Sequence, residues 1–163
     1  MVSSDGIIRV KAMLIASDSK DSAHLVSVCP PTRENPRGYH RLIGGGVEVG
    51  ETHREAVIRE VREELDASIR DLAYLDVVEN IFSLNGRLGH EIVFVHTGRL
   101  DPEPPPEGAQ LVETDGTVLP VVWRTLHDAA DALPLYPAAV ALLASRPAPV
   151  ARLRSCEPSR QSD

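Results

Sequence analysis

The order of hydrophobic and polar positions predicts a chain of strands interrupted by one amphipathic helix. The first apolar run, residues 7–16, is rich in β-branched side chains and favours a buried strand. A polar turn at residues 17–22 and a second apolar run at residues 25–29 follow, so the two runs are expected to pair as a hairpin. A brief strand over residues 39–43 should then deliver the chain to a turn formed by the glycines at 44–46.

Residues 52–65 have the periodicity of an amphipathic helix. Thr52 followed by Glu55 matches a capping box, which predicts that the helix begins near Thr52. Residues 56–65 contain neither glycine nor proline and are rich in good helix formers, so the helix should continue to about Leu65. At about 100° per residue, one apolar stripe is expected to face the core. Its predicted members are Val57, Ile58, Val61 and Leu65.

Three glutamates border this stripe. Glu60, Glu63 and Glu64 occupy positions i, i+3 and i+4, where like charges repel and raise one another's pKa values. A hard divalent cation such as Mg²⁺ takes oxygen ligands and would turn this repulsion into attraction. Arg59 and Arg62 offer a plainer alternative, because they would neutralise the glutamates as a solvated, salt-bridged face. The helix alone leaves both interpretations open.

A second hairpin is predicted after the helix. Residues 69–82 carry apolar side chains suited to an extended strand. Asn85-Gly86 lies at the centre of residues 83–89, and this pair is a strong signal for a hairpin turn. The return strand is therefore expected over residues 90–100.

The remainder of the chain is expected to complete the domain. Residues 101–108 contain four prolines and are predicted to form a stiff loop, because proline removes a backbone donor and fixes φ. From residue 147 onward, apolar periodicity is lost and proline, serine and arginine increase. We therefore expect one domain over residues 1–146 and a disordered tail over residues 147–163. A last strand and two short helices are predicted at residues 119–123, 126–133 and 138–145.

The predicted elements follow one another as strand hairpin, helix, strand hairpin, strand and C-terminal helix. This order suits a mixed sheet covered by helices, in the α/β (α+β) class. With 163 residues, the chain is long enough for one domain with a sizeable core.

Composition and charge limit the partners that the chain can have. Hydrophobic residues make up 42% of the chain and charged residues 25%, as in globular proteins. The net charge of −7 argues against a nucleic-acid polymer or an anionic membrane as the main partner, but not against a small phosphorylated substrate. Cys29 and Cys156 alone provide neither a disulfide framework nor a zinc pattern. The N-terminus lacks a signal-peptide pattern and no apolar run has membrane-spanning length, so we expect a cytoplasmic location.

One stretch of the sequence has fixed spacings that extend beyond the helix. It reads Gly45, five residues, Glu51, seven residues, Arg59-Glu60-Val61, one residue, Glu63-Glu64. This stretch, over residues 45–67, resembles the Nudix box, the motif of the Nudix hydrolase superfamily of MutT-like proteins. The preceding Leu42 and the run GGGVE at residues 44–48 also resemble the family's usual lead-in.

The chain departs from the family pattern at three positions. Ile43 stands where the family often has proline, and Ala67 where it usually has a larger apolar residue. Asp66 replaces a glycine that would serve a left-handed helix C-terminus. Aspartate tolerates that conformation better than most residues but less well than glycine, so we expect a modest cost in stability and an intact site.

The resemblance implies a fold and a set of site residues. The fold would be an α/β/α sandwich with a mixed sheet between helices. Glu51 would pair with Arg59 and hold the preceding turn on the helix. The implied ligands of a divalent metal are Glu60, Glu63, Glu64 and the backbone carbonyl of Gly44.

The resemblance also implies a reaction. Water would attack the pyrophosphate linkage of a nucleoside diphosphate joined to another group, with Mg²⁺ as the cofactor and Mn²⁺ as a substitute. The general base varies within the family, and Glu64 and Glu91 are both candidates here. The partner would be a small-molecule nucleoside diphosphate derivative, and a homodimer is expected by analogy.

The sequence leaves two questions open. Residues 81–85 lack the proline and the tyrosine that mark two substrate classes of the family, so the nucleotide stays unidentified. The alternative function is a non-hydrolytic Nudix domain that senses a nucleotide or binds a protein. Loss of a box carboxylate would favour that alternative, and all of them are present.

Overall fold

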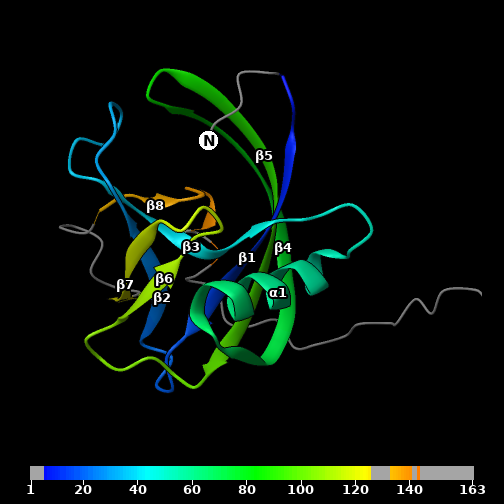
Figure 1. Cartoon of the computed structure of the whole chain (residues 1–163), viewed down its shortest axis with the longest axis vertical. Coiled ribbons are helices and arrows are strands. Elements are labelled where there is room, and N and C mark those ends of the chain that lie inside the picture. Colours follow the sequence, from blue (N-terminus) through cyan, green and yellow to red (C-terminus); the bar gives the residue numbers. More distant parts are fainter. Residues whose placement is uncertain (1–5, 126–132, 141–142, 144–163) are drawn as a thin grey trace, which may run out of the picture.

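The computed structural model describes residues 6–125, 133–140 and 143. These residues form one helix and eight strands, which Figure 1 shows in chain order. The elements are β1 (Arg9–Ser17), β2 (Ala23–Cys29), β3 (Tyr39–Gly46), α1 (His53–Leu65), β4 (Ser68–Leu84), β5 (Arg87–Asp101), β6 (Ala109–Val112), β7 (Val118–Thr125) and β8 (Leu135–Tyr136). The short strands β6 and β8 were not predicted from the sequence. The predicted C-terminal helices at 126–133 and 138–145 lie largely outside the described residues.

The strands form a mixed sheet in the order β4-β5-β1-β3-β2-β7-β6, with β8 paired to β3. The β1–β5 and β3–β8 pairs are parallel and the other pairs are antiparallel. This arrangement confirms the predicted α+β class. In the described part of the chain, no helix has the length and apolar character that crossing a bilayer requires.

The sheet buries side chains on both of its faces. Leu14 of β1 belongs to a core cluster that includes Val57 and Val61 of α1. The neighbouring Met13 and Ile15 belong to a second cluster. Because successive side chains of a strand point to opposite faces, β1 contributes to both clusters in alternation. The helix therefore covers one face of a sheet whose other face is also packed.

The hairpin formed by β4 and β5 is longer than predicted. Its ladder continues to the pair Leu84↔Arg87, so the turn contains only Asn85 and Gly86. Both turn residues have positive φ values, 51° and 77°, which asparagine and glycine tolerate. In Figure 1 the turn of this hairpin lies far from α1, at the other end of the molecule. The wider turn expected over residues 83–89 was therefore wrong.

The three glycines before the helix do not form the predicted turn. Gly44, Gly45 and Gly46 extend β3 and pair with β1, and the chain turns only afterwards, over residues 47–52. Gly44 has a φ of 128°, and a Cβ atom there would lie 2.2 Å from the carbonyl oxygen of Ala12. Glycine is therefore required at position 44 by the close approach of two strands.

The bounds of α1 agree with the prediction, and its buried stripe agrees in part, because Val57 and Val61 are buried as predicted and Leu65 packs against their cluster. Thr52 is the N-cap of a complete capping box. Asp66 ends the helix in the left-handed conformation, with φ 50° and ψ 40°. Ile58 was predicted to face the core, yet it is 40% exposed. The helix instead buries Ala56, Val57, Glu60, Val61 and Glu64.

Candidate functional site

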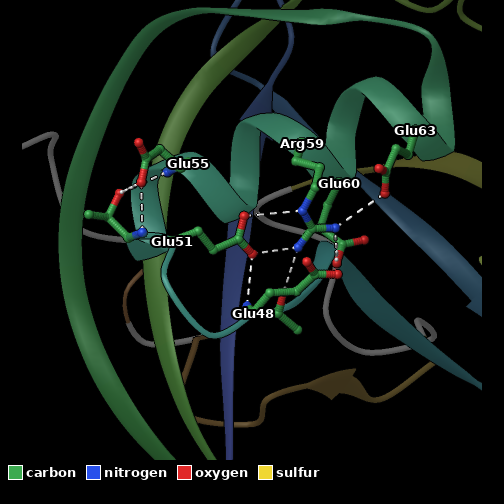
Figure 2. A network of polar contacts seen from close by, with 8 residues as sticks. Glu48, Glu51, Glu55, Arg59, Glu60 and Glu63 are labelled. Carbon is green, nitrogen blue, oxygen red and sulfur yellow. Dashed lines mark hydrogen bonds and ion pairs between the residues drawn. The ribbon is translucent and has the colours of Figure 1, made fainter.

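Arg59 is the centre of the polar network on α1. Its Nη2 donates to Glu51 Oε1 at 2.6 Å and to the Gly46 carbonyl at 2.9 Å, while its Nε donates to Glu51 Oε2 at 3.2 Å (Figure 2). Glu51 also accepts from the backbone N–H of Glu48 at 2.8 Å. Bidentate pairing of this kind fixes geometry as well as charge. The expected pair Glu51–Arg59 thus holds the loop before the helix against both β3 and α1.

The same arginine contacts two of the box glutamates. Its Nη1 donates to Glu60 Oε1 at 3.1 Å and to Glu63 Oε2 at 3.2 Å. The Glu60 side chain is only 9% exposed, whereas that of Glu63 is 55% exposed. A Cβ atom on Gly45 would lie 2.4 Å from the Glu60 carboxylate. The glycine at this position therefore provides the space that Glu60 occupies.

Glu64 is buried without a full set of partners. The residue is 5% exposed, and its Oε2 has no hydrogen-bond partner among the described residues. The pKa of Glu64 is raised to about 8, chiefly by burial and also by the nearby carboxylates of Glu113 and Glu60, while Arg41 and Lys11 oppose the shift. A buried carboxylate oxygen without a donor is costly unless a cation compensates it.

Two residues near Glu64 were missed by the sequence analysis. Arg41 of β3 forms an ion pair with Glu113, which follows β6, and both affect the pKa of Glu64. They are 72 residues apart, and no motif relates them. The only sequence signal was a charged residue, Arg41, in the middle of the strand predicted over residues 39–43.

An open cavity of about 150 Å³ adjoins this charged group. Lys11 and Arg41 line it, and these are the two cations that act on Glu64. Its other walls include Tyr39, Phe82 and Tyr136. No residue of α1 lines the cavity. Lys11 and Arg41 therefore form the boundary between the box glutamates and the cavity.

The structure places Glu91 in the cavity wall. Its Oε2 accepts a hydrogen bond from Asn80 Nδ2 at 3.2 Å, across the β4–β5 ladder. Among the described residues, Glu91 forms no hydrogen bond or ion pair with α1. Its predicted role as a general base thus stays a prediction.

A divalent metal suits the residues that the structure brings together. Glu60 and Glu64 are both buried on α1 and are close enough to affect each other's charge. Within the described residues, no three His, Cys, Asp or Glu side chains converge as a finished ligand set. Glu63 faces Arg59, and the Gly44 carbonyl belongs to a residue paired with β1. The hard oxygen donors and the unpartnered Oε2 of Glu64 fit Mg²⁺ or Mn²⁺.

The first turn of α1 packs on aromatic rings of the sheet. His53 stacks on Phe94 with ring centroids 4.3 Å apart, and its Nδ1 lies 2.9 Å from Nε2 of His96. The pKa of His96 is lowered to about 4, chiefly by burial and also by the proximity of His53. Since one imidazole must donate to the other, the pair is compatible with two neutral rings.

Comparisons with known proteins agree with this geometry. The family model described as "NUDIX domain" matches residues 8–144. The structure is similar to a MutT NUDIX hydrolase from Burkholderia pseudomallei, with 25% identity, a TM-score of 0.63 and coverage of 86% of this chain and 99% of that chain. No curated protein sequence matches the chain.

Two further solved structures share the fold. A NUDIX hydrolase from Nitrosomonas europaea is 18% identical, with a TM-score of 0.54 and coverage of 74% of each chain. A MutT protein from Bacillus halodurans is 18% identical, with a TM-score of 0.50 and coverage of 73% of this chain and 69% of that chain. The family match covers most of the sequence, and every charged residue of the box is present. The chain therefore belongs to the Nudix hydrolase superfamily, as a MutT-like pyrophosphohydrolase.

Proposed function

We propose that this protein uses Mg²⁺ to hydrolyse the pyrophosphate linkage of a nucleoside diphosphate derivative, and that Mn²⁺ can replace Mg²⁺. The observation that carries the proposal is the buried Oε2 of Glu64, which has no donor among the described residues. Glu60 lies beside Glu64, and the positively charged side chains of Lys11 and Arg41 lie between these two glutamates and the cavity. Such a site can accept a cation on one side and an anionic diphosphate on the other.

Each box residue has a role in this proposal. Glu60, Glu63 and Glu64 would hold the metal, with the Gly44 carbonyl as a further ligand. A bound divalent ion would neutralise the diphosphate and lower the pKa of the attacking water. Glu63 would exchange its contact with Arg59 for that ion, while Arg59 would keep its contacts with Glu51 and with the Gly46 carbonyl.

Residues at the cavity boundary would bind the substrate. Lys11 and Arg41 lie where the diphosphate must pass from the glutamates to the cavity, so their positive charges would orient it. The ion pair between Arg41 and Glu113 keeps this guanidinium in place before substrate arrives. We propose Glu64 as the group that accepts the water proton, and Glu91 as a substrate-contacting residue of the cavity.

The proposal is tested by measuring, with liquid chromatography, the nucleoside monophosphate formed from each compound of a substrate panel. The panel contains nucleoside triphosphates and their oxidised forms, ADP-ribose, nucleotide sugars and dinucleoside polyphosphates, each with Mg²⁺ and then Mn²⁺. The wild type should hydrolyse one class well above the others, and Glu64→Gln should be inactive on all of them. A wild type that binds these compounds without forming a nucleoside monophosphate would instead support a nucleotide sensor.

Three further expectations are part of the proposal. The net charge of −7 supports a small-molecule partner over a nucleic-acid polymer or a membrane, and we propose a cytoplasmic location. The domain is proposed to end near residue 146, with residues 147–163 as a tail. A homodimer is proposed by analogy, and its measurement is the mass in solution by light scattering.

A further inference from the structure

The outer part of the β4–β5 hairpin, residues 81–90, forms one wall of the cavity. Phe82, Leu84 and His90 are among the lining residues that it contributes. The Phe82 ring lies over Gly89, where a Cβ atom would approach the ring to 2.4 Å. We call residues 81–90 the hairpin arm. The position of the hairpin arm therefore affects the volume of the cavity.

The hairpin arm has little support from the rest of the sheet. The ladder between β1 and β5 begins at the pair Arg9↔Glu91, so in the described sheet the arm pairs only within itself. Ile81 and Leu88 on the arm are 60% and 66% exposed. A two-stranded hairpin is marginally stable on its own. The arm therefore depends on other contacts to stay in place.

Those contacts come from a loop more than 50 residues away in the sequence. Glu34 accepts hydrogen bonds from the backbone N–H groups of Asn85, at 2.7 Å, and of Gly86, at 2.9 Å. The N–H of Arg33 donates to Asn85 Oδ1 at 3.0 Å. The two N–H groups lower the pKa of Glu34, so the carboxylate is charged at neutral pH. We call these four residues the latch.

The latch lies directly beside the cavity. Asn35 follows Glu34 in the loop and Leu84 precedes Asn85 in the hairpin, and both line the cavity. Asn35 also accepts a hydrogen bond from the hydroxyl of Tyr136, at 3.4 Å, so the loop is joined to β8, which lines the cavity as well. Closing the latch therefore brings two walls of the cavity together.

We propose that the latch is a specificity-determining element that limits the size of the group attached to the diphosphate. With the latch closed, a single nucleoside or a group of similar size fits. A substrate with a second large group beyond the cavity requires the arm to move outward, which breaks the latch. The latch residues are exposed, so their hydrogen bonds compete with water and can open. This inference rests on the proposed hydrolysis of nucleoside diphosphate derivatives.

Two latch variants and one control test the proposal. Glu34→Ala removes both acceptors, and Asn85→Gly removes the acceptor for Arg33 while keeping a residue that tolerates positive φ. Glu107→Ala removes another exposed carboxylate, from a loop outside the latch. Each protein is assayed with Mg²⁺ on a nucleoside triphosphate and on a dinucleoside polyphosphate of the same nucleoside.

The expected result is a change in the ratio of the two kcat/KM values. We expect the ratio of the large substrate to the small one to rise about tenfold in both latch variants, because the cost of opening is removed. The kcat for the small substrate should be unchanged, since α1 and its glutamates are untouched, while its KM should rise slightly. Glu107→Ala should resemble the wild type, and Glu34→Gln, which keeps one acceptor oxygen, should be intermediate.

Amide hydrogen exchange distinguishes failure of the latch proposal from failure of the proposed function. The backbone amides of Asn85 and Gly86 should exchange faster in Glu34→Ala than in the wild type. Faster exchange with an unchanged substrate ratio would overturn the proposed size selection. Unchanged exchange would show that Glu34 does not hold the arm, and would overturn it as well. A wild type that hydrolyses neither substrate contradicts the proposed function itself, which the exchange rates do not measure.

Discussion

The box glutamates and the cavity are held in place by contacts of different kinds. Arg59 alone joins Glu51, Glu60, Glu63 and the Gly46 carbonyl, all within 13 residues of it in the sequence, and the Glu51 and Glu60 side chains are largely protected from water. The cavity is lined by segments from residue 7 to residue 137, and its hairpin arm is tied down by a few exposed hydrogen bonds. The box glutamates are thus fixed by local contacts, while the shape of the cavity depends on distant ones.

The largest contrast is expected between two glutamates, one on α1 and one in the cavity. Glu64→Gln should lower kcat by about a hundredfold or more on every substrate, because it removes a metal ligand and the proposed proton acceptor. Glu91→Gln should change KM for some substrates and leave kcat within a few-fold. Steady-state kinetics on the substrate panel measures both.

Thermal melting followed by circular dichroism shows whether the variants in this comparison remain folded. Glu64→Gln should melt at or above the wild-type temperature, because a neutral amide replaces a buried carboxyl group without a donor. Equal loss of kcat in both variants would move Glu91 into the reaction. Near-wild-type kcat in Glu64→Gln would contradict the proposed mechanism.

The histidine pair under the first turn of α1 should make stability depend on pH. The folded pKa of His96 is about 4, below the usual 6.5, so an unfolded chain binds its proton at a higher pH than the folded one. Stability should therefore fall as the pH drops from about 6.5 to about 4, by about 1.4 kcal/mol per pKa unit for a single group. Urea unfolding at pH 7.5 and pH 5 gives the slope.

A His96 variant separates this contribution from others. His24 is also buried, and burial lowers its pKa to about 4, so it adds to the same slope. His96→Asn should flatten the pH dependence without abolishing it, whatever its stability at neutral pH. An unchanged slope would show that His96 does not remain neutral in the folded protein.

Two adjacent glycines offer a matched test of the packing at the box. A Cβ atom at position 45 would lie 2.4 Å from the Glu60 carboxylate, whereas one at position 46 would meet nothing within 4 Å. Gly45→Ala should lower the free energy of unfolding by about 1–3 kcal/mol and weaken Mn²⁺ binding, because Glu60 must move. Gly46→Ala should change neither quantity. Urea unfolding and Mn²⁺ titration by electron paramagnetic resonance measure both, and equal effects would contradict the packing argument.

The smallest effect is expected at the end of the helix. Asp66 has a φ of 50°, a conformation that glycine adopts with less strain. Asp66→Gly should raise the free energy of unfolding by about 0.5–1 kcal/mol and leave kcat unchanged, because its side chain has no part in the reaction. Thermal melting with an activity assay checks both, and a lower melting temperature would show that Asp66 contributes more than its backbone conformation.

The parts of the structure that were predicted correctly depend on neighbours in the sequence. The capping box at Thr52, the left-handed Asp66 and the hairpin turn at Asn85-Gly86 are each set by a few adjacent residues. The pair Glu51–Arg59 spans only eight residues and followed from the family resemblance. Such features are determined by local conformational preferences, which a sequence displays directly.

The parts that were missed depend on contacts between distant segments. The glycines at 44–46 were expected to turn, but they lie against β1, which no local pattern reveals. Ile58 was expected to be buried, but Glu60 and Glu64 occupy the buried side of the helix instead. The ion pair Arg41–Glu113 and the latch join residues 51 to 72 positions apart without any fixed spacing. Their partners become visible only when the sheet is assembled.

The irregular course of β4 has a consequence for association between molecules. Among the described strands, β4 lies at one end of the sheet, so one row of its backbone N–H and C=O groups lacks a neighbouring strand. Its register shifts between Arg70 and Ala73 and again between Tyr74 and Asp76. Asp71, which lies within the first of these shifts, has a φ of 55°. These bulges interrupt the regular spacing of free backbone groups that a strand from another molecule would need. The protein can therefore carry a 17-residue border strand without offering a continuous template for aggregation.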